Sequence, residues 1–211
     1  RRAFLKNGAL VLSGLTFPAL GRQVSGAFDT NQRGAVCIGL VTDLHYADKP
    51  PAGSRHYRET LAKLKEAATQ FHNDRPDFVV FQGDLIDSGK SLAQEKTHLQ
   101  TVVKAISAIP FPKYYVLGNH CVDPLTKNEF LQGVGQNANI PPEELSWLQV
   151  DLKQTMLPTI VFAHQPLDLK DTDAHAVKNS SKVRNVLEQS GKVTAVFQGH
   201  SHHNKYSEIK G

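Results

Sequence analysis

The stretch Val36-Cys37-Ile38-Gly39-Leu40-Val41-Thr42-Asp43-Leu44-His45 places an apolar run directly before an Asp and a His. A short apolar run that ends at a polar loop predicts a buried β-strand over residues 36–42. Apolar side chains at helical spacing follow over residues 55–71. The segment therefore predicts a strand, a loop and a helix, in that order.

The same order recurs along the rest of the chain. Four further apolar runs predict strands over residues 78–81, 113–117, 159–163 and 193–197. Helices are expected over residues 99–109, 141–152 and 180–187. Alternating strands and helices predict one α/β domain with a largely parallel sheet and helices on its faces.

A polar cluster follows each of the five predicted strands. The clusters are Asp43-Leu44-His45, Gly83-Asp84, Gly118-Asn119-His120, His164 and Gly199-His200-Ser201-His202. In open α/β sheets ligands bind at the carboxyl ends of the strands. We therefore expect the five clusters to converge on one site.

These clusters carry side chains that bind metals. The candidate ligands are Asp43, His45, Asp84, Asn119, His164, His200 and His202. Their nitrogen and oxygen donors suit manganese, iron, zinc or cobalt better than calcium, and Asp84 can bridge two cations because a carboxylate has two oxygens. Any one cluster has an ordinary explanation, since Gly-Asp is usually a turn and a single His after a strand is usually a surface residue. Five clusters at successive strand ends instead predict a metal site.

The five clusters, in this order, resemble the motifs of the calcineurin-like metallophosphoesterase superfamily over residues 36–203. The resemblance implies a four-layer α/β/β/α sandwich that holds two divalent metal ions. It also implies hydrolysis of phosphomonoester, phosphodiester or nucleotide diphosphate bonds in a small phosphorylated substrate. Two adjacent metals lower the pKa of a bridging water, so hydroxide and not a side chain would be the nucleophile.

The resemblance also assigns separate roles to the candidate residues. One metal would be held by Asp43, His45, Asp84 and His202, and the other by Asp84, Asn119, His164 and His200. His120 would not be a ligand. It would be the catalytic group that meets the substrate phosphate and protonates or stabilises the leaving oxygen.

Two features depart from the family pattern. Many members have an Asp after the Asn-His pair, whereas this chain has Cys121, and a thiol is a weak hydrogen-bonding partner. Asp123 or another group would then have to orient His120. Relatives also have two or more strands where this chain has only residues 122–140, and the chain stops at Gly211 inside an expected hairpin. The sandwich is therefore expected to be shortened in its middle and at its C-terminus, and the domain incomplete.

Residues near the first two clusters limit the range of candidate substrates. Purple acid phosphatases have a Tyr shortly after the Gly-Asp pair, and its absence here disfavours that subgroup. Residues 42–48, 55–58 and 83–87 look similar to the manganese-dependent ADP-ribose/CDP-alcohol diphosphatase branch. Arg55, Tyr57 and Arg58 are accordingly candidate substrate-binding residues. The alternative is that Tyr57 packs in the core while the two arginines are solvated.

The N-terminal segment predicts an export signal over residues 1–27. Paired arginines and Phe4-Leu5-Lys6 precede the uncharged run 8–20, and Ser25-Gly26-Ala27 offers a cleavage site, as in twin-arginine signals. The run is too short for a stable membrane anchor. Recognition by the bacterial export machinery would carry a domain of residues 28–211 to the periplasm or the extracellular medium. A basic amphipathic helix that starts the domain is the alternative.

Charge and cysteine content limit the remaining functions. The predicted signal holds four of the 24 basic residues and none of the 20 acidic ones, so the net charge of +4 disappears from the rest of the chain. A nucleic-acid partner is therefore not expected, which counts against a nuclease. Cys37 and Cys121 are too few for a disulfide scaffold, and their pairing is left open. A secreted metal-binding protein without turnover is the other alternative.

Overall fold

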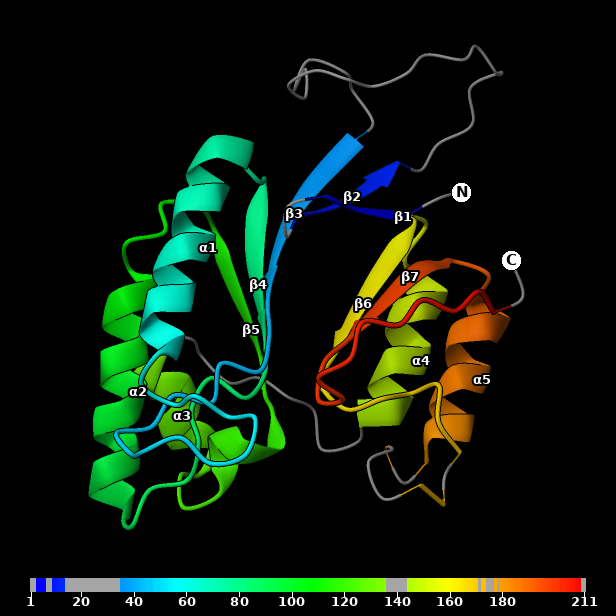
Figure 1. The fold of residues 1–211 in the computed structure, drawn as a ribbon. Coiled ribbons are helices and arrows are strands. Elements are labelled where there is room, and N and C mark those ends of the chain that lie inside the picture. Colours follow the sequence, from blue (N-terminus) through cyan, green and yellow to red (C-terminus); the bar gives the residue numbers. More distant parts are fainter. Residues whose placement is uncertain are drawn as a thin grey trace.

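The computed structural model of the 211-residue chain describes residues 3–6, 9–13, 35–135, 144–170, 172–173, 177 and 179–209. Figure 1 shows two halves whose sheets face one another, with helices on the outer side of each sheet. The layers therefore run helix, sheet, sheet, helix. The predicted α/β fold is confirmed.

The first half contains three parallel strands built from β-α-β units. Strands β3 (Ala35–Val41), β4 (Phe78–Gln82) and β5 (Lys113–Val116) are parallel neighbours in that order. Helix α1 (Thr60–Asp74) connects β3 to β4, and α2 (Leu92–Ile106) connects β4 to β5. In Figure 1 both helices cover the same face of the sheet. All three strands consequently end at the same edge.

The core of this half lies between the sheet and its helices. Phe71 in α1 and Leu99 and Val102 in α2 pack with Val79 and Phe81 of β4, the middle one of the three parallel strands, and each is at most 2% exposed. Burial of one large apolar side chain contributes about 1.5–3 kcal/mol. This core fixes β4, which leads directly to the predicted ligand Asp84.

The second half repeats the pattern on a smaller scale. Helix α4 (Glu144–Gln154) precedes β6 (Thr159–Ala163), and α5 (Ser180–Ser190) precedes β7 (Val193–Gln198). The two strands are parallel and form their own sheet. Its core contains Leu152, Leu167, Val186 and Leu187. None of the described helices is both long and apolar enough to cross a membrane.

Several boundaries differ from the sequence prediction. Helix α1 begins at Thr60 and not at residue 55, because Arg55 and Ala52 exchange two backbone hydrogen bonds of 3.0 Å that close a turn. Helix α2 begins at Leu92, well before residue 99, because the Ser91 side chain accepts a hydrogen bond from the Gln94 amide and caps the helix. Residues 141–143, where a helix start was expected, lie outside the described residues.

The connection between β5 and β6 contains no strand in its described residues, 117–135 and 144–158. It holds the short helix η1 (Asn119–Val122), α3 (Lys127–Gly133) and α4. The sequence did not predict α3, which is held by a capping box between Thr126 and Glu129. The second sheet has two strands in the described part of the chain.

Two strands lie within the predicted export signal. Strand β1 (Ala3–Lys6) pairs antiparallel with β2 (Ala9–Ser13), and β2 pairs antiparallel with β3 at the edge of the first sheet. In these two segments the backbone is extended, so the alternative of a starting helix is not observed there. The export signal stays a prediction.

Candidate metal centre

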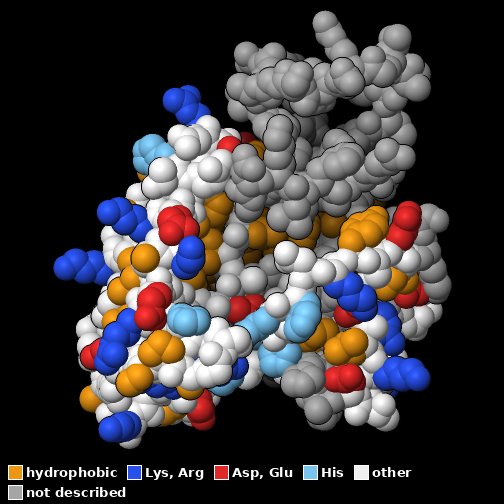
Figure 2. Space-filling view, in the orientation of Figure 1, with side chains coloured by type: hydrophobic (Ala, Val, Ile, Leu, Met, Phe, Trp, Pro, Cys, Tyr) orange, Lys and Arg blue, Asp and Glu red, His pale blue; other side chains and the backbone are white. Residues whose placement is uncertain are grey.

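Every predicted ligand lies just past the carboxyl end of a strand. Gln82, the last residue of β4, joins the two strand ends at the site, because its side-chain amide donates to the Ala163 carbonyl (3.0 Å) and its backbone carbonyl accepts a hydrogen bond from His164 Nδ1 (2.9 Å). Figure 2 shows histidine side chains gathered where the two halves meet. The structure thus brings the clusters of both halves together.

The first group of candidate ligands is Asp43, His45 and His202, whose donor atoms lie within 4.8 Å of one another. His45 Nε2 lies 3.1 Å from His202 Nε2, and His202 Nε2 lies 3.3 Å from Asp43 Oδ1. Two imidazole nitrogens and a carboxylate oxygen that point at one another are a donor set for one cation.

The second group is Asp84, His164 and His200, which meets the same distance limit. His164 Nε2 lies 3.1 Å from Asp84 Oδ2 and 3.3 Å from Asn119 Oδ1, while His200 Nδ1 lies 3.1 Å from Asn119 Oδ1. All four side chains that the resemblance assigned to the second metal therefore converge. This donor set fits a second cation.

Asp84 lies between the two groups. Its Oδ2 is 3.6 Å from His45 Nε2 and 3.1 Å from His164 Nε2, so one oxygen faces both sets of ligands. Its Oδ1 accepts a hydrogen bond from the His120 amide (2.9 Å). Oδ2 is therefore the oxygen that would face both ions, whereas the sequence argument had relied on both oxygens.

Hydrogen bonds outside the groups orient the two buried imidazoles. His45 Nδ1 donates to Asp87 Oδ2 (3.1 Å), and His164 Nδ1 donates to the Gln82 carbonyl (2.9 Å). A proton on Nδ1 leaves the Nε2 lone pair directed at the site, which is the usual arrangement of a metal-binding histidine. Both rings are therefore preset for coordination.

The backbone at the site is unusual. Six non-glycine residues in the described part of the chain have positive φ, and five of them are predicted ligands: Asp43 (53°), His45 (46°), Asp84 (48°), His200 (68°) and His202 (53°). The sixth, Arg75, ends helix α1. Left-handed backbone is unfavourable for residues with a side chain and concentrates at functional sites.

Gly118 permits the close approach of two loops. A Cβ at this position would lie 2.1 Å from Asp84 Oδ1 and 2.3 Å from the Asp84 backbone nitrogen. A larger residue would therefore displace Asp84, the residue shared by the two groups. This contact explains the glycine before Asn119.

The acidic and imidazole groups influence one another's protonation. Burial acts against the charged form of Asp43, but hydrogen bonds with His45 and Thr42 outweigh it and hold the pKa of Asp43 well below its ordinary value. Burial likewise opposes charge on His45 and His164, yet bonds to Asp43 and Asp84, respectively, raise the pKa of each. The carboxylates stay ionised, as metal ligands must.

His120 stands beside both groups. Its ring packs edge-on against His45 with centroids 4.9 Å apart, and its Nδ1 lies 3.9 Å from Asp87 Oδ2. Asp123, which the sequence offered as a partner for His120, is exposed. Asp87 is therefore the carboxylate placed to orient this imidazole. Ligand atoms of His45, Asp84 and His120 also lie within 4.8 Å of one another, so proximity alone does not distinguish His120 from a ligand.

Asp87 also gathers two basic side chains. Lys49 Nζ lies 2.8 Å from its Oδ1, and Arg55 Nη1 lies 2.9 Å from its Oδ2. The sequence argument missed the roles of Asp87 and Lys49. The sequence signal that could have identified Asp87 is its acidic side chain, three positions after Asp84 in a loop that begins at the metal site.

The three candidate substrate-binding residues surround this loop. Arg55 binds Asp87, and the Arg58 Nε lies 2.6 Å from Asp48 Oδ1. Tyr57 is 7% exposed, and Lys49 Nζ lies 4.3 Å from the centre of its ring. Tyr57 is thus packed, and both arginines have acidic partners within the protein.

The two cysteines are unpaired in the structure. Cys121 is fully buried, and burial raises the pKa of its thiol to about 11. It is therefore protonated at neutral pH and packs as a small core residue. No nucleophilic role is needed for it.

Comparisons with known proteins agree with this geometry. A family model described as calcineurin-like phosphoesterase matches residues 38–204. A solved dimetal phosphatase from Danio rerio superposes with a TM-score of 0.63 at 19% sequence identity, covering 78% of this chain and 81% of the other. At that identity the likeness concerns the fold.

Two curated relatives are similar in sequence. A manganese-dependent ADP-ribose/CDP-alcohol diphosphatase from Arabidopsis thaliana is 27% identical over 44% of this chain and 32% of its own length. A probable cyclic nucleotide phosphodiesterase from Pseudoalteromonas sp. (strain SM9913) is 26% identical over 82% of this chain and 74% of its own length. The chain thus spans about a third of the diphosphatase.

Proposed function

The chain belongs to the calcineurin-like phosphoesterase family, and we propose that it hydrolyses phosphate ester or diphosphate bonds of small substrates with two divalent metal ions. One observation carries the proposal. Asp84 Oδ2 lies 3.6 Å from His45 Nε2 and 3.1 Å from His164 Nε2, so one carboxylate oxygen faces both groups of candidate ligands.

The proposed ligands follow from these contacts. Asp43, His45, Asp84 and His202 would hold one ion, and Asp84, Asn119, His164 and His200 the other. When bound, a metal pair lowers the pKa of water and stabilises negative charge on phosphoryl oxygens. Manganese is the proposed metal because the Arabidopsis relative is named as manganese-dependent.

The chain's own residues supply the remaining steps. His120 Nδ1 faces Asp87, so Nε2 is the atom left to donate a proton to the leaving oxygen. Asp87 lies 3.9 Å from that ring nitrogen and also forms a hydrogen bond with His45. The His120 amide donates to Asp84 Oδ1, which ties the proton donor to the shared carboxylate.

The substrate class is proposed from the relatives. The Arabidopsis protein is named for ADP-ribose and CDP-alcohols, and the Pseudoalteromonas protein for cyclic nucleotides. In the nucleotides of both names, a phosphorus atom is linked through two of its oxygens to other groups. We therefore favour a phosphodiester or nucleotide diphosphate over a simple phosphomonoester.

Hydrolysis of three substrates by the full chain reconstituted with manganese tests the proposal. The substrates are bis-p-nitrophenyl phosphate, p-nitrophenyl phosphate and ADP-ribose. We expect turnover of at least one, and a loss of about 100-fold or more in kcat for His120→Ala with metal content unchanged, since acid catalysis contributes about 10²–10⁴-fold.

His203→Ala is the matched control, because His203 is an exposed histidine beside His202 whose ring bonds the Ser201 carbonyl. Its activity should equal that of the unchanged chain. Bound manganese without turnover of any of the three substrates would identify a metal-binding protein of this fold and overturn the enzyme proposal.

Export is a separate proposal that rests on the paired arginines and the apolar run that follows them. Residues 1–27 fused to a reporter should carry it to the bacterial periplasm, and Arg1→Lys with Arg2→Lys should abolish that transport. A reporter that stays in the cytoplasm with the intact arginines would refute the signal.

A further inference from the structure

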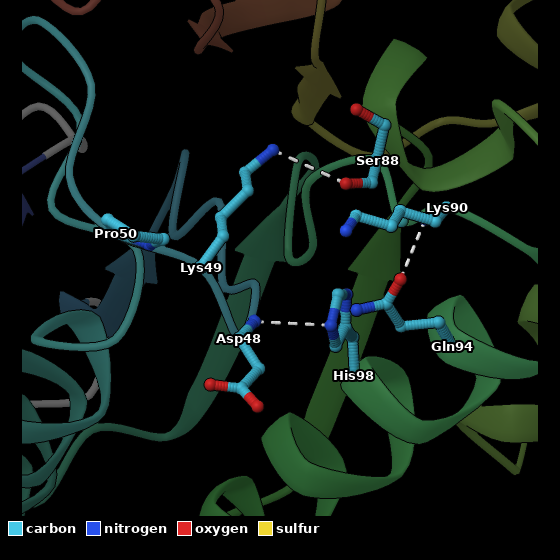
Figure 3. A pocket seen from close by; sticks show the side chains of 8 residues that line it. Asp48, Lys49, Pro50, Ser88, Lys90, Gln94 and His98 are labelled. Atoms are coloured by element: carbon cyan, nitrogen blue, oxygen red, sulfur yellow. Dashed lines mark hydrogen bonds between the residues drawn. The ribbon is translucent and has the colours of Figure 1, made fainter.

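A small cavity lies beside the metal centre and is not part of it. Its volume is about 220 Å³, and its lining includes Asp48, Lys49, Ser88, Lys90 and His98 (Figure 3). Sites for whole drug-sized ligands measure about 300–1,000 Å³. This cavity therefore suits one small group and not a complete nucleotide.

His98 lines this cavity and holds a buried polar atom. The residue is 3% exposed, and its Nε2 accepts a hydrogen bond from the Asp48 amide (3.1 Å). Because Nε2 uses its lone pair, the neutral ring carries its proton on Nδ1. His98 Nδ1 is the buried side-chain polar atom without a hydrogen-bond partner among the described residues. A buried donor in that state favours a ligand that brings an acceptor.

Two ammonium groups add positive charge. In Figure 3 the Lys90 side chain points into the cavity, and the described residues give its ammonium no ion pair or hydrogen bond. Lys49 Nζ lies 2.8 Å from Asp87 Oδ1 and 3.3 Å from the Ser88 carbonyl. Among the described residues, Lys90 is thus the lining cation without a partner, whereas Lys49 is paired with Asp87.

The acidic groups nearby are already paired. Asp48 Oδ1 accepts from Arg58 (2.6 Å), and Asp87 is bound by Lys49 and Arg55. Glu95, behind the cavity, accepts hydrogen bonds from the Gly89 and Leu125 amides. The groups left over are donors and a cation, so the complementary ligand is an oxyanion.

We propose that this cavity is an oxyanion-binding site for a phosphate group, with Lys90 and His98 as its principal donors. Asp87 joins it to the metal centre, since Oδ1 contacts Lys49 and Oδ2 contacts His45. The phosphate is either free inorganic phosphate or the second phosphate of a diphosphate substrate. The latter source rests on the proposed function, whereas binding itself does not.

Phosphate binding is tested with the full chain kept free of metal by a chelator, so that phosphate cannot bind through the metal centre. Inorganic phosphate is the probe, and the readout is the ¹⁵N and ¹H resonance of His98 Nδ1. We expect a protonated Nδ1 whose resonance shifts in a saturable way, with about a tenfold higher Kd in Lys90→Gln, as for loss of one hydrogen bond to a charged group.

Lys104→Gln is the matched control, because Lys104 is an exposed lysine in the last turn of α2, the helix that carries His98. Its Kd should equal that of the unchanged chain. No shift of the His98 resonance, or equal affinity in the Lys90 and Lys104 variants, would overturn the site. Lys90 is exposed, so its variant should fold, and its melting temperature verifies this.

Kinetics of the manganese-loaded chain separate the two sources. If the second phosphate of a substrate occupies the cavity, Lys90→Gln raises KM for ADP-ribose about tenfold and leaves KM for bis-p-nitrophenyl phosphate unchanged. If free phosphate is the occupant, both KM values stay the same while phosphate binding weakens. Equal increases in both KM values would contradict both sources.

Discussion

Both halves of the molecule contribute side chains to one site, but the strands that carry these side chains are buried to different extents. In the first half, residues 79–81 of β4 are at most 2% exposed. In the second half no residue of β6 or β7 reaches that burial, and Trp147, Val150, Met156 and Leu157 are exposed. Correspondingly, the His45 side chain is 4% exposed and that of His202 is 35% exposed.

The candidate ligands of one metal centre therefore come from two halves whose cores differ in size. The first half provides Asp43, His45, Asp84 and Asn119 from loops anchored by a substantial core. The second half provides three histidines from a sheet of two strands in its described residues. Metal binding would therefore link the half with the larger core to the half with the smaller one. Because a metal that binds only the folded state stabilises that state, the second half should gain stability from it.

The largest effect is expected from Asp84→Asn, because Asp84 serves both halves. Loss of the shared carboxylate should lower kcat/KM by more than the roughly 10–100-fold typical of outer hydrogen-bond partners. Manganese content should fall well below that of the unchanged chain, as measured by mass spectrometry. Two tightly bound ions in this variant would show that Asp84 does not bridge, and would remove the link between the halves.

Substitutions in the two cores test directly whether the core of the first half contributes more to the free energy of unfolding than the core of the second half. Phe81→Ala in β4 should lower the free energy of unfolding by about 3–5 kcal/mol, because a fully buried aromatic leaves a cavity. Leu187→Ala in the thinner core should cost near the lower end of about 2–5 kcal/mol. Urea denaturation measures both. A larger loss from Leu187 would reverse the comparison.

Asp87→Asn tests the outer support of the first half. Asp87 bonds His45 Nδ1 and faces His120, so the variant should lose about 10–100-fold in metal affinity or activity. Asp151→Asn is the control, since Asp151 is an exposed acid on α4. Equal metal affinity and equal kcat for the two variants would remove Asp87 from the site.

Hydrogen exchange gives the smallest expected effect and sharpens the comparison further. Free manganese at ten times its Kd should slow the exchange of amide hydrogens in the loop at residues 199–203 by about tenfold. This is the value expected when one ligand binds only the state in which these amides are protected. Exchange in β4, which the core already protects, should change less. Greater slowing in β4 would show that the second half is not the weaker support.

The sequence predicted the strands better than the helices, for physical reasons. Short apolar runs identify buried strands, and β6 begins and ends where the pattern placed it. Helix α3 spans only residues 127–133 and has too few turns to show a periodic apolar face. The start of α1 was wrong because a turn at Ala52 and Arg55, and not periodicity, sets it.

The candidate site could be predicted to the extent that its chemistry is local. Asp43 and His45 share one turn, and each further ligand follows a strand, so sequence position alone indicated convergence. The partners of those ligands are distant in the chain. Asp87 meets His45 across 42 positions, and Lys49 meets Asp87 across 38, which no local pattern reveals. Substrate binding by Arg55, Tyr57 and Arg58 stays a prediction.

The left-handed backbone at the site places this protein under two opposed kinds of selection. A side chain in that conformation costs about 1–2 kcal/mol, a penalty that glycine avoids. Glycine at His202 would relax the loop and give a hardier metal-free chain, yet it would delete an imidazole from the first donor set. At these five positions, substitutions that stabilise the metal-free chain and residues that supply the proposed ligands are therefore in conflict.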